Sequence, residues 1–181
     1  MSQNRTYTKW PMTAGLAPTV RMVLDWFTIF GHAVAPPVLR IALALPFFRS
    51  GLTRWDGFLS LAPSASYLFE EEFKLHIFGG EYGFPAPVVV AHLVSVAEIA
   101  LPILLVLGLA TRAAALGLLV MTGVIQLVVP DGWANFHLYW AALALAIIAL
   151  GAGPLSLDRL IYGRSVPRTG PVSMFGGKRA K

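Results

Sequence analysis

The sequence contains no cysteine, and only 13% of its 181 residues are charged. Without cysteine the chain can form no dithiol relay, no thiolate-bound iron–sulfur cluster, no c-type haem attachment and no cysteine nucleophile. A Gly-rich phosphate loop, a nucleophile elbow and a zinc-binding histidine pair at helical spacing are also absent. These absences exclude disulfide-exchanging membrane oxidoreductases as functional analogues and leave no recognisable catalytic motif.

Apolar residues are abundant instead, at 56% of the chain, and the mean hydropathy is +0.68. Four apolar stretches approach the roughly 20 residues that a helix needs to cross a hydrocarbon core. They cover about residues 34–53, 86–109, 113–130 and 133–152. A tight turn at Thr111-Arg112 and another at 130–132 force neighbouring helices to pack antiparallel. The sequence therefore predicts an all-α, polytopic membrane protein with an antiparallel bundle of four transmembrane helices.

The distribution of lysine and arginine predicts the orientation of this bundle, because positive residues that flank spans are retained in the cytoplasm. Most of them lie in the amino-terminal segment, at Arg112 and in the carboxy-terminal tail. The external loop, about 54–85, holds most of the acidic residues. We therefore expect a bacterial inner-membrane protein with both termini in the cytoplasm. The net charge of +5 is concentrated at the chain ends, so the expected partner is the lipid bilayer and not nucleic acid.

The segment before the first span has its own pattern. Within about 19–32, Val20, Val23 and Phe27 recur at helical spacing. This pattern predicts a helix that lies in the cytoplasmic interface. The alternative is that the segment lengthens the first span. We expect the helix to begin the main domain, 19–160, between a disordered cytoplasmic segment, 1–18, and a basic cytoplasmic tail, 161–181.

The spans contain landmarks in a fixed order, at 39–44 and 47–55 in the first, 97–98 in the second, 105–115 at the next turn, and 153–158 after the fourth. This order resembles the DoxX family of small four-helix bacterial membrane proteins, over about residues 36–160. Two further stretches, 67–73 and 123–126, resemble the DoxX subgroup encoded with maturation enzymes for metal-binding peptides.

Two functions follow from this resemblance. It implies a non-catalytic membrane subunit or scaffold for redox or metal-handling protein partners. The alternative is a quinone-interacting membrane subunit of an oxidoreductase complex. No cofactor is encoded, so a quinone would be the ligand in the second case, and electrons would come from another chain. Whether the protein is part of an enzyme stays open at this stage.

An ionisable group inside a bilayer is costly and often marks a functional site. Glu98 lies near the centre of the second predicted span, and Arg40 and Arg49 lie within about 8 Å of the centre of the first. We therefore expect Glu98 to form an ion pair with one of these arginines. The pair would either bind a proton or the head of a quinone, or simply fix the register of two helices.

Other polar residues gather in the outer half of the predicted bundle: His92 and Ser95 in the second span, Gln126 in the third and His137 in the fourth. With Arg49 at their level, they would line an outward-facing pocket for a quinone head or another small ligand. Two histidines on different helices also suggest a bis-histidine haem or a metal site. The plainer interpretation places His137 in an interfacial aromatic belt.

Acidic residues in the external loop offer weak metal candidates, namely Glu70, His76 and Glu81. Three consecutive glutamates begin at Glu70, and on a helix they point about 100° apart, so they cannot all converge on one ion. A solvated helix face is favoured, with Phe69 and Phe73 turned towards the bundle. We therefore expect no metal site.

Overall fold

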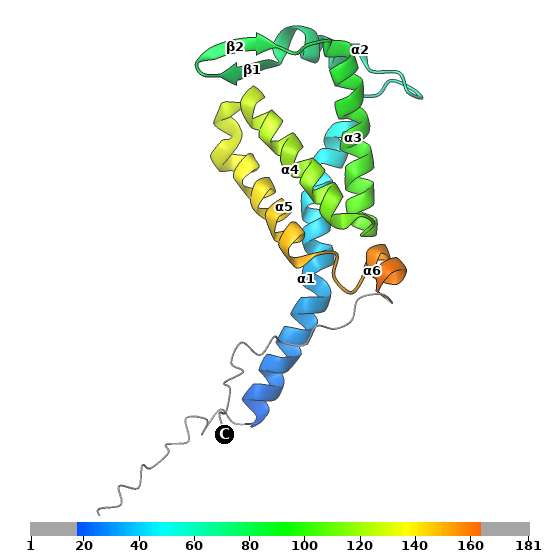
Figure 1. Cartoon of the computed structure of the whole chain (residues 1–181), viewed down its shortest axis with the longest axis vertical. Helices are drawn as coiled ribbons and strands as arrows, with labels where there is room; N and C mark the ends of the chain where they lie inside the picture. The colour runs from blue at the N-terminus through cyan, green and yellow to red at the C-terminus, as the bar shows by residue number, and fades with distance from the viewer. Residues whose placement is uncertain (1–17, 164–181) are drawn as a thin grey trace, which may run out of the picture.

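The computed structural model of the chain describes residues 18–163 (Figure 1). In chain order the elements are α1 (Pro18–Leu52), α2 (Pro63–Tyr67), η1 (Leu68–Glu72), β1 (Lys74–Ile77), β2 (Gly80–Gly83), α3 (Pro87–Leu107), α4 (Thr111–Val128), η2 (Pro130–Gly132), η3 (Trp133–His137), α5 (Leu138–Leu150) and α6 (Leu157–Tyr162). The predicted terminal segments, 1–18 and 161–181, lie outside the described residues except at positions 18 and 161–163.

Four helices in the described part of the chain are long and apolar enough to cross a membrane: Met22–Leu52, Pro87–Leu107, Thr111–Val128 and Pro130–Leu150. Each corresponds to one predicted span, which confirms a predominantly helical, multi-pass membrane fold. The turn predicted at Thr111-Arg112 lies at 108–110 instead. Gly108 ends α3 because its φ of +69° is a conformation that glycine adopts without steric penalty.

Helix α1 is continuous over 35 residues, or about 52 Å at 1.5 Å per residue. The predicted break between a helix at 19–32 and a separate one at 34–53 is therefore absent, because one helix runs through both. No residue near 33 ends a helix, and α1 also continues through Pro36 and Pro37. Its amino-terminal part projects beyond the bundle (Figure 1).

Helices α1 and α3 run antiparallel with a marked stagger. Gly51, in the last turn of α1, packs so closely on α3 that an added Cβ would lie 3.0 Å from Cβ of Glu98. At the other end of the contact, Arg40 lies against Gly108. Helix α1 therefore ends level with the middle of α3, and the first half of α3 extends past it.

Below we call the end of the bundle that carries β1 and β2 the hairpin end, and the end that carries α6 and the 108–110 turn the terminal end. The two strands pair antiparallel from Lys74 opposite Gly83 to Ile77 opposite Gly80, an element that was not predicted. The hairpin lies across the end of α4 (Figure 1).

A side-chain hydrogen bond links the hairpin to α4. The ring Nδ1 of His76 donates a hydrogen bond of 3.1 Å to the carbonyl oxygen of Leu127. Just before the hairpin, η1 exposes its three glutamates and buries Phe69, as predicted. The loop therefore forms a structured cover over the hairpin end.

The bundle core lies between all four long helices and consists of Leu43, Ala44 and Phe47 of α1, Leu105 of α3, Ala114, Ala115 and Leu118 of α4, and Ala144 and Ile147 of α5. Alanine is frequent because, between helices in lipid, close backbone approach replaces the hydrophobic effect as the source of attraction. This packing is concentrated in the terminal half, below the level at which α1 ends.

Candidate functional site

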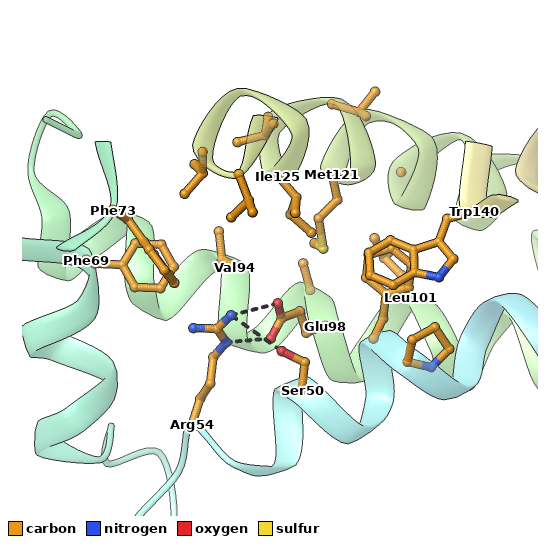
Figure 2. Close-up of a pocket in the computed structure, with 18 of the residues that line it drawn as sticks. Ser50, Arg54, Phe69, Phe73, Val94, Glu98, Leu101, Met121, Ile125 and Trp140 are labelled. Carbon is orange, nitrogen blue, oxygen red and sulfur yellow. Dashed lines mark hydrogen bonds and ion pairs between the residues drawn. The ribbon is translucent and has the colours of Figure 1, made fainter. Parts of the chain in front are cut away.

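A buried ion pair joins the end of α1 to the middle of α3. Nε of Arg54 lies 2.6 Å from Oε2 of Glu98, and Nη2 lies 3.0 Å from Oε1. Figure 2 shows the two parallel bonds between the planar groups. Glu98 is only 1% exposed. This bidentate geometry is the strongest common form of a carboxylate–guanidinium pair, which offsets part of the desolvation of both charges.

Arg54 is held in place by more than its carboxylate partner. Its guanidinium carbon lies 5.2 Å from the centre of the Phe69 ring, within the range of a cation–π contact. Nη2 also lies 3.5 Å from the Ser50 hydroxyl oxygen. The third nitrogen, Nη1, makes no hydrogen bond with any residue in 18–163 and points away from Glu98 (Figure 2). One donor of the pair is therefore available to a ligand.

The ion pair borders a cavity of about 400 Å³ (Figure 2). Apart from Ser50, Arg54 and Glu98, its lining is apolar. Helix α1 contributes Phe47, α5 contributes Trp140, and the cover contributes three phenylalanines that include Phe69. The cavity exists because α1 stops at this level, and the aromatic rings of the loop only partly fill the space beyond its end.

One side of the cavity lies between α3 and α4. These helices share the tight 108–110 turn and diverge from it towards the hairpin end (Figure 1). Val94 and Leu101 of α3 line one wall, and Val120 and Val124 of α4 line the other. Val120 is 60% and Val124 37% exposed, so this edge of the cavity faces the surroundings of the bundle. In a membrane those surroundings are lipid.

The expected pairing of Glu98 with Arg40 or Arg49 is wrong. Arg40 is level with Gly108, ten residues or about 15 Å along α3 from Glu98. Arg49 is exposed on α1. The prediction assumed that the two spans cross in register, whereas α1 is shifted towards the terminal end.

Arg54 was missed as the partner of Glu98 because it follows the helix and was assigned to the external loop. Its spacing of four residues from Ser50 places both on one side of the chain as it leaves α1. That spacing is the signal in the sequence that pointed to a shared site.

Arg40 belongs to a separate polar cluster at the terminal end. The side chain is 2% exposed and donates a hydrogen bond from Nη2 to the carbonyl oxygen of Leu155. Nearby, the carboxylate of Asp158 accepts hydrogen bonds of 2.7 and 2.8 Å from the backbone amides of Ala110 and Thr111. Asp158 thereby provides acceptors for backbone N–H groups at the start of α4. The N-cap residue, Ala110, has no side chain that could do so.

The electrostatics of Asp158 agree with this structural role. Burial alone would raise the pKa of its carboxyl group. The hydrogen bonds from Thr111 and Ala110 and the nearby positive charge of Arg40 outweigh burial, so the pKa lies below its usual value. The folded protein therefore favours the ionised carboxylate at this position.

The other predicted site residues do not surround one pocket. Ser95 is buried and donates to the carbonyl of Ala91 within its own helix. His92 is exposed, donates to the carbonyl of Val88 and contacts the edge of Trp55. Neither residue lines the cavity beside Glu98.

The other histidine pairs with a glutamine. Nδ1 of His137 donates a bond of 2.6 Å to Oε1 of Gln126, whose amide nitrogen donates to the carbonyl of Pro130. His137 is 3% exposed and packs on Trp140. It is therefore a buried residue that joins α4 to η3, not part of an exposed aromatic belt. Because His92 has different partners, the geometry does not support a haem held by both histidines.

The weak metal candidates are also separate. Nε2 of His76 lies 3.7 Å from Oε1 of Glu81 across the hairpin, and Glu70 contributes only its carbonyl oxygen, to Lys74. Across residues 18–163, no three histidine, aspartate or glutamate side chains are grouped as metal ligands. These loop residues have ordinary roles at an exposed surface.

Comparison with known proteins gives the family. The DoxX family model matches residues 35–131, which is more than half of the chain. The chain belongs to the DoxX family. The match begins at the predicted start of the resemblance and ends just after α4. No solved structure matches this DoxX protein significantly.

A curated relative of this DoxX protein is an uncharacterized protein of Haemophilus influenzae. It is 29% identical over 150 residues, which cover 72% of this chain and 85% of the relative. The relative carries no stated activity. The expected link to the metal-binding-peptide subgroup of DoxX proteins stays a prediction.

Proposed function

We propose that this DoxX protein is a membrane subunit that binds a quinone-class ligand in the cavity beside Arg54 and Glu98. One observation carries the proposal: a largely apolar cavity, with one edge between α3 and α4, contains a single charged pair with an available donor. A quinone combines a small polar head with an apolar tail and reaches the protein through lipid.

The size and chemistry of the cavity support this choice. A volume of about 400 Å³ lies within the usual range of roughly 300 to 1,000 Å³ for small-molecule sites. Aromatic side chains, including Phe47 and Trp140, can pack against a flat ring. Nη1 of Arg54 is placed to donate to a carbonyl oxygen. An anionic ligand is disfavoured because Glu98 already compensates the charge of Arg54.

The chain would bind the ligand without carrying out the redox step. With no cysteine and no grouped metal ligands in the described part, electrons would have to come from a partner subunit. The proposal thus joins the two functions derived from the sequence. The scaffold role towards redox or metal-handling proteins stays a prediction because the geometry identifies no protein partner.

The proposal also places the protein in the bacterial inner membrane with both ends in the cytoplasm. The arginine-rich terminal end and the acidic external loop support this orientation. Reporter fusions would test it. A fluorescent protein fused after residue 181 should fold and fluoresce, whereas alkaline phosphatase at the same position should stay inactive. The opposite pair of results would reverse the topology.

Ligand binding can be tested directly with decylubiquinone. The protein would be reconstituted in lipid nanodiscs, and binding would be followed by quenching of tryptophan fluorescence, since Trp140 lines the cavity. Val124→Phe should fill the cavity and weaken binding about tenfold, equivalent to about 1.4 kcal/mol. The matched control is Leu116→Phe, which adds the same ring to an exposed position of α4 that does not line the cavity.

A second variant tests the polar head contact. The double variant Arg54→Leu/Glu98→Leu removes the available donor without leaving an unpaired charge and should also weaken binding, while Leu116→Phe should bind like the unmodified protein. Equal quenching in all three variants would show that decylubiquinone only partitions into the lipid, and the proposal would then be wrong. Absence of saturable quenching in the unmodified protein would have the same meaning.

A further inference from the structure

A second depression lies at the terminal end, far along α3 from Glu98. It has a volume of about 350 Å³ and is lined by Arg112, Arg159 and residues 151–153, with Ser156 and Asp158 beside them. The Arg112 guanidinium lies over Gly151, with Nη2 3.5 Å from the position that a Cβ there would take. Two arginines from different helices thus face one small space.

Their positive charge is not compensated within the described part of the chain. No ion pair in residues 18–163 involves Arg112 or Arg159, and both are exposed. Asp158 is the one carboxylate among the residues that line the depression. Its oxygens already accept hydrogen bonds from the amides of Ala110 and Thr111, and its charge is near Arg40. The depression is therefore a cationic site that suits an anion.

An apolar groove adjoins this cationic site. It has a volume of about 1060 Å³ and runs between the part of α1 that projects beyond the bundle and the 150–154 connection. Phe27, Ile29 and Pro36 line the side on α1. Leu150, Gly153 and Arg159 line both the groove and the cationic depression. The cationic depression and the apolar groove are thus continuous with each other.

We propose that the terminal end binds one anionic phospholipid, with its phosphate between Arg112 and Arg159 and an acyl chain in the groove along α1. Guanidinium groups bind phosphate by charge-assisted, often paired hydrogen bonds. Arg112 lies in the first turn of a membrane-spanning helix, where lipid headgroups begin. Basic pockets between such helices are a known type of headgroup site.

The exposed apolar surface of α1 agrees with a lipid occupant. Phe27 is 71% and Ile29 72% exposed. They belong to the part of α1 that projects beyond the bundle (Figure 1). An acyl chain held in the groove would cover part of this surface and brace the projecting helix against the 150–154 connection. This site is separate from the cavity beside Glu98, and it does not depend on quinone binding.

Native mass spectrometry of the full-length protein would test the proposal. Delipidated protein in detergent would be titrated with phosphatidylglycerol or with zwitterionic phosphatidylcholine. We expect one phosphatidylglycerol to bind at least about tenfold more tightly than phosphatidylcholine. The Arg112→Gln/Arg159→Gln variant should abolish that preference, and Arg112→Lys/Arg159→Lys should keep most of it because the charges remain.

The matched control removes two positive charges elsewhere, as Arg49→Gln/Lys74→Gln, and should bind phosphatidylglycerol like the unmodified protein. Ala33→Phe, which fills the groove, should weaken binding while both arginines remain. Equal binding of the two lipids, or an unchanged preference in the Arg112→Gln/Arg159→Gln variant, would overturn the proposal. Displacement of the lipid by millimolar inorganic phosphate would identify a free anion as the ligand and would also overturn it.

Discussion

Each end of the bundle contains an arginine and a carboxylate, but the two sets use their hydrogen bonds differently. At the terminal end, Arg40 and Asp158 direct their hydrogen bonds to backbone groups of Leu155, Ala110 and Thr111. At the hairpin end, Arg54 and Glu98 bond to each other and border an open cavity. Each arginine keeps one nitrogen without a hydrogen-bond partner in residues 18–163, but only the Arg54–Glu98 pair borders a cavity.

This difference shows why a buried charge alone does not identify a functional site. Arg40 is as deeply buried as Glu98, yet its surroundings are filled by the 155–158 segment and the Gly108 turn. What distinguishes Glu98 is the adjoining space created where α1 ends. Mutations that separate structural stability from ligand binding can test this division between the two ends.

The largest loss of stability is expected from Glu98→Gln. It leaves the charge of Arg54 buried without a counter-charge, which is expected to destabilise the protein by about 3–5 kcal/mol. The double variant Glu98→Leu/Arg54→Leu should recover most of that loss because no uncompensated charge remains. Unfolding in increasing concentrations of a denaturing detergent measures the stability of both variants. A double variant less stable than Glu98→Gln would contradict this account.

A somewhat smaller loss is expected from Asp158→Ala. It removes two hydrogen bonds at the start of α4 and the negative charge near Arg40. Together these losses should lower the free energy of unfolding by about 2–4 kcal/mol. Decylubiquinone binding by the folded protein should be unchanged because the cavity is distant. Asp131→Ala is the control, since Asp131 is exposed and makes no ion pair within residues 18–163. Equal melting temperatures for the two variants would argue against a structural role of Asp158.

Two glycines of α1 should respond in opposite directions. Gly51→Ala forces a methyl group to within 2.9 Å of Cγ1 of Ile99 and should destabilise the α1–α3 contact by about 1–3 kcal/mol. Gly31→Ala meets no atom within 4 Å and should stabilise the helix by about 0.5–1 kcal/mol. Thermal unfolding in detergent compares them, and similar shifts would disprove the close approach at Gly51.

The smallest effect is expected from acid and follows from Asp158. Its pKa is lowered in the folded protein, so its contribution is fully present above the pKa of the unfolded chain, about 3.9. That contribution is lost as the pH falls through the lower folded pKa. The stability gap between the unmodified protein and Asp158→Asn should be constant from neutral pH to about pH 5 and should narrow below about pH 4. A gap that widens in acid would exclude this role.

Much of the fold could be predicted because membrane spans have a strong signal in composition and length. That Glu98 has a cationic partner could also be predicted, since a carboxylate inside an apolar helix needs one. The identity of this partner could not be predicted. The stagger of α1 against α3 depends on where Gly51 and Gly108 permit close contact, and neither the hydropathy nor the length of a span records that offset.

The cavity and the hairpin were missed for different reasons. The cavity depends on α1 ending half-way along α3, which is a property of packing. The hairpin had a local signal, since Leu75 and Ile77 alternate with polar residues before the Gly79-Gly80 pair.

The opening between α3 and α4 also determines which concentration controls occupancy of the cavity. A ligand that enters from lipid is dissolved in two dimensions, so its mole fraction in the bilayer matters, and its nominal molarity does not. Adding plain phospholipid to a fixed amount of protein and ligand would dilute the ligand and empty the cavity, even though the volume of the sample stays the same. A site reached from water would not respond in this way.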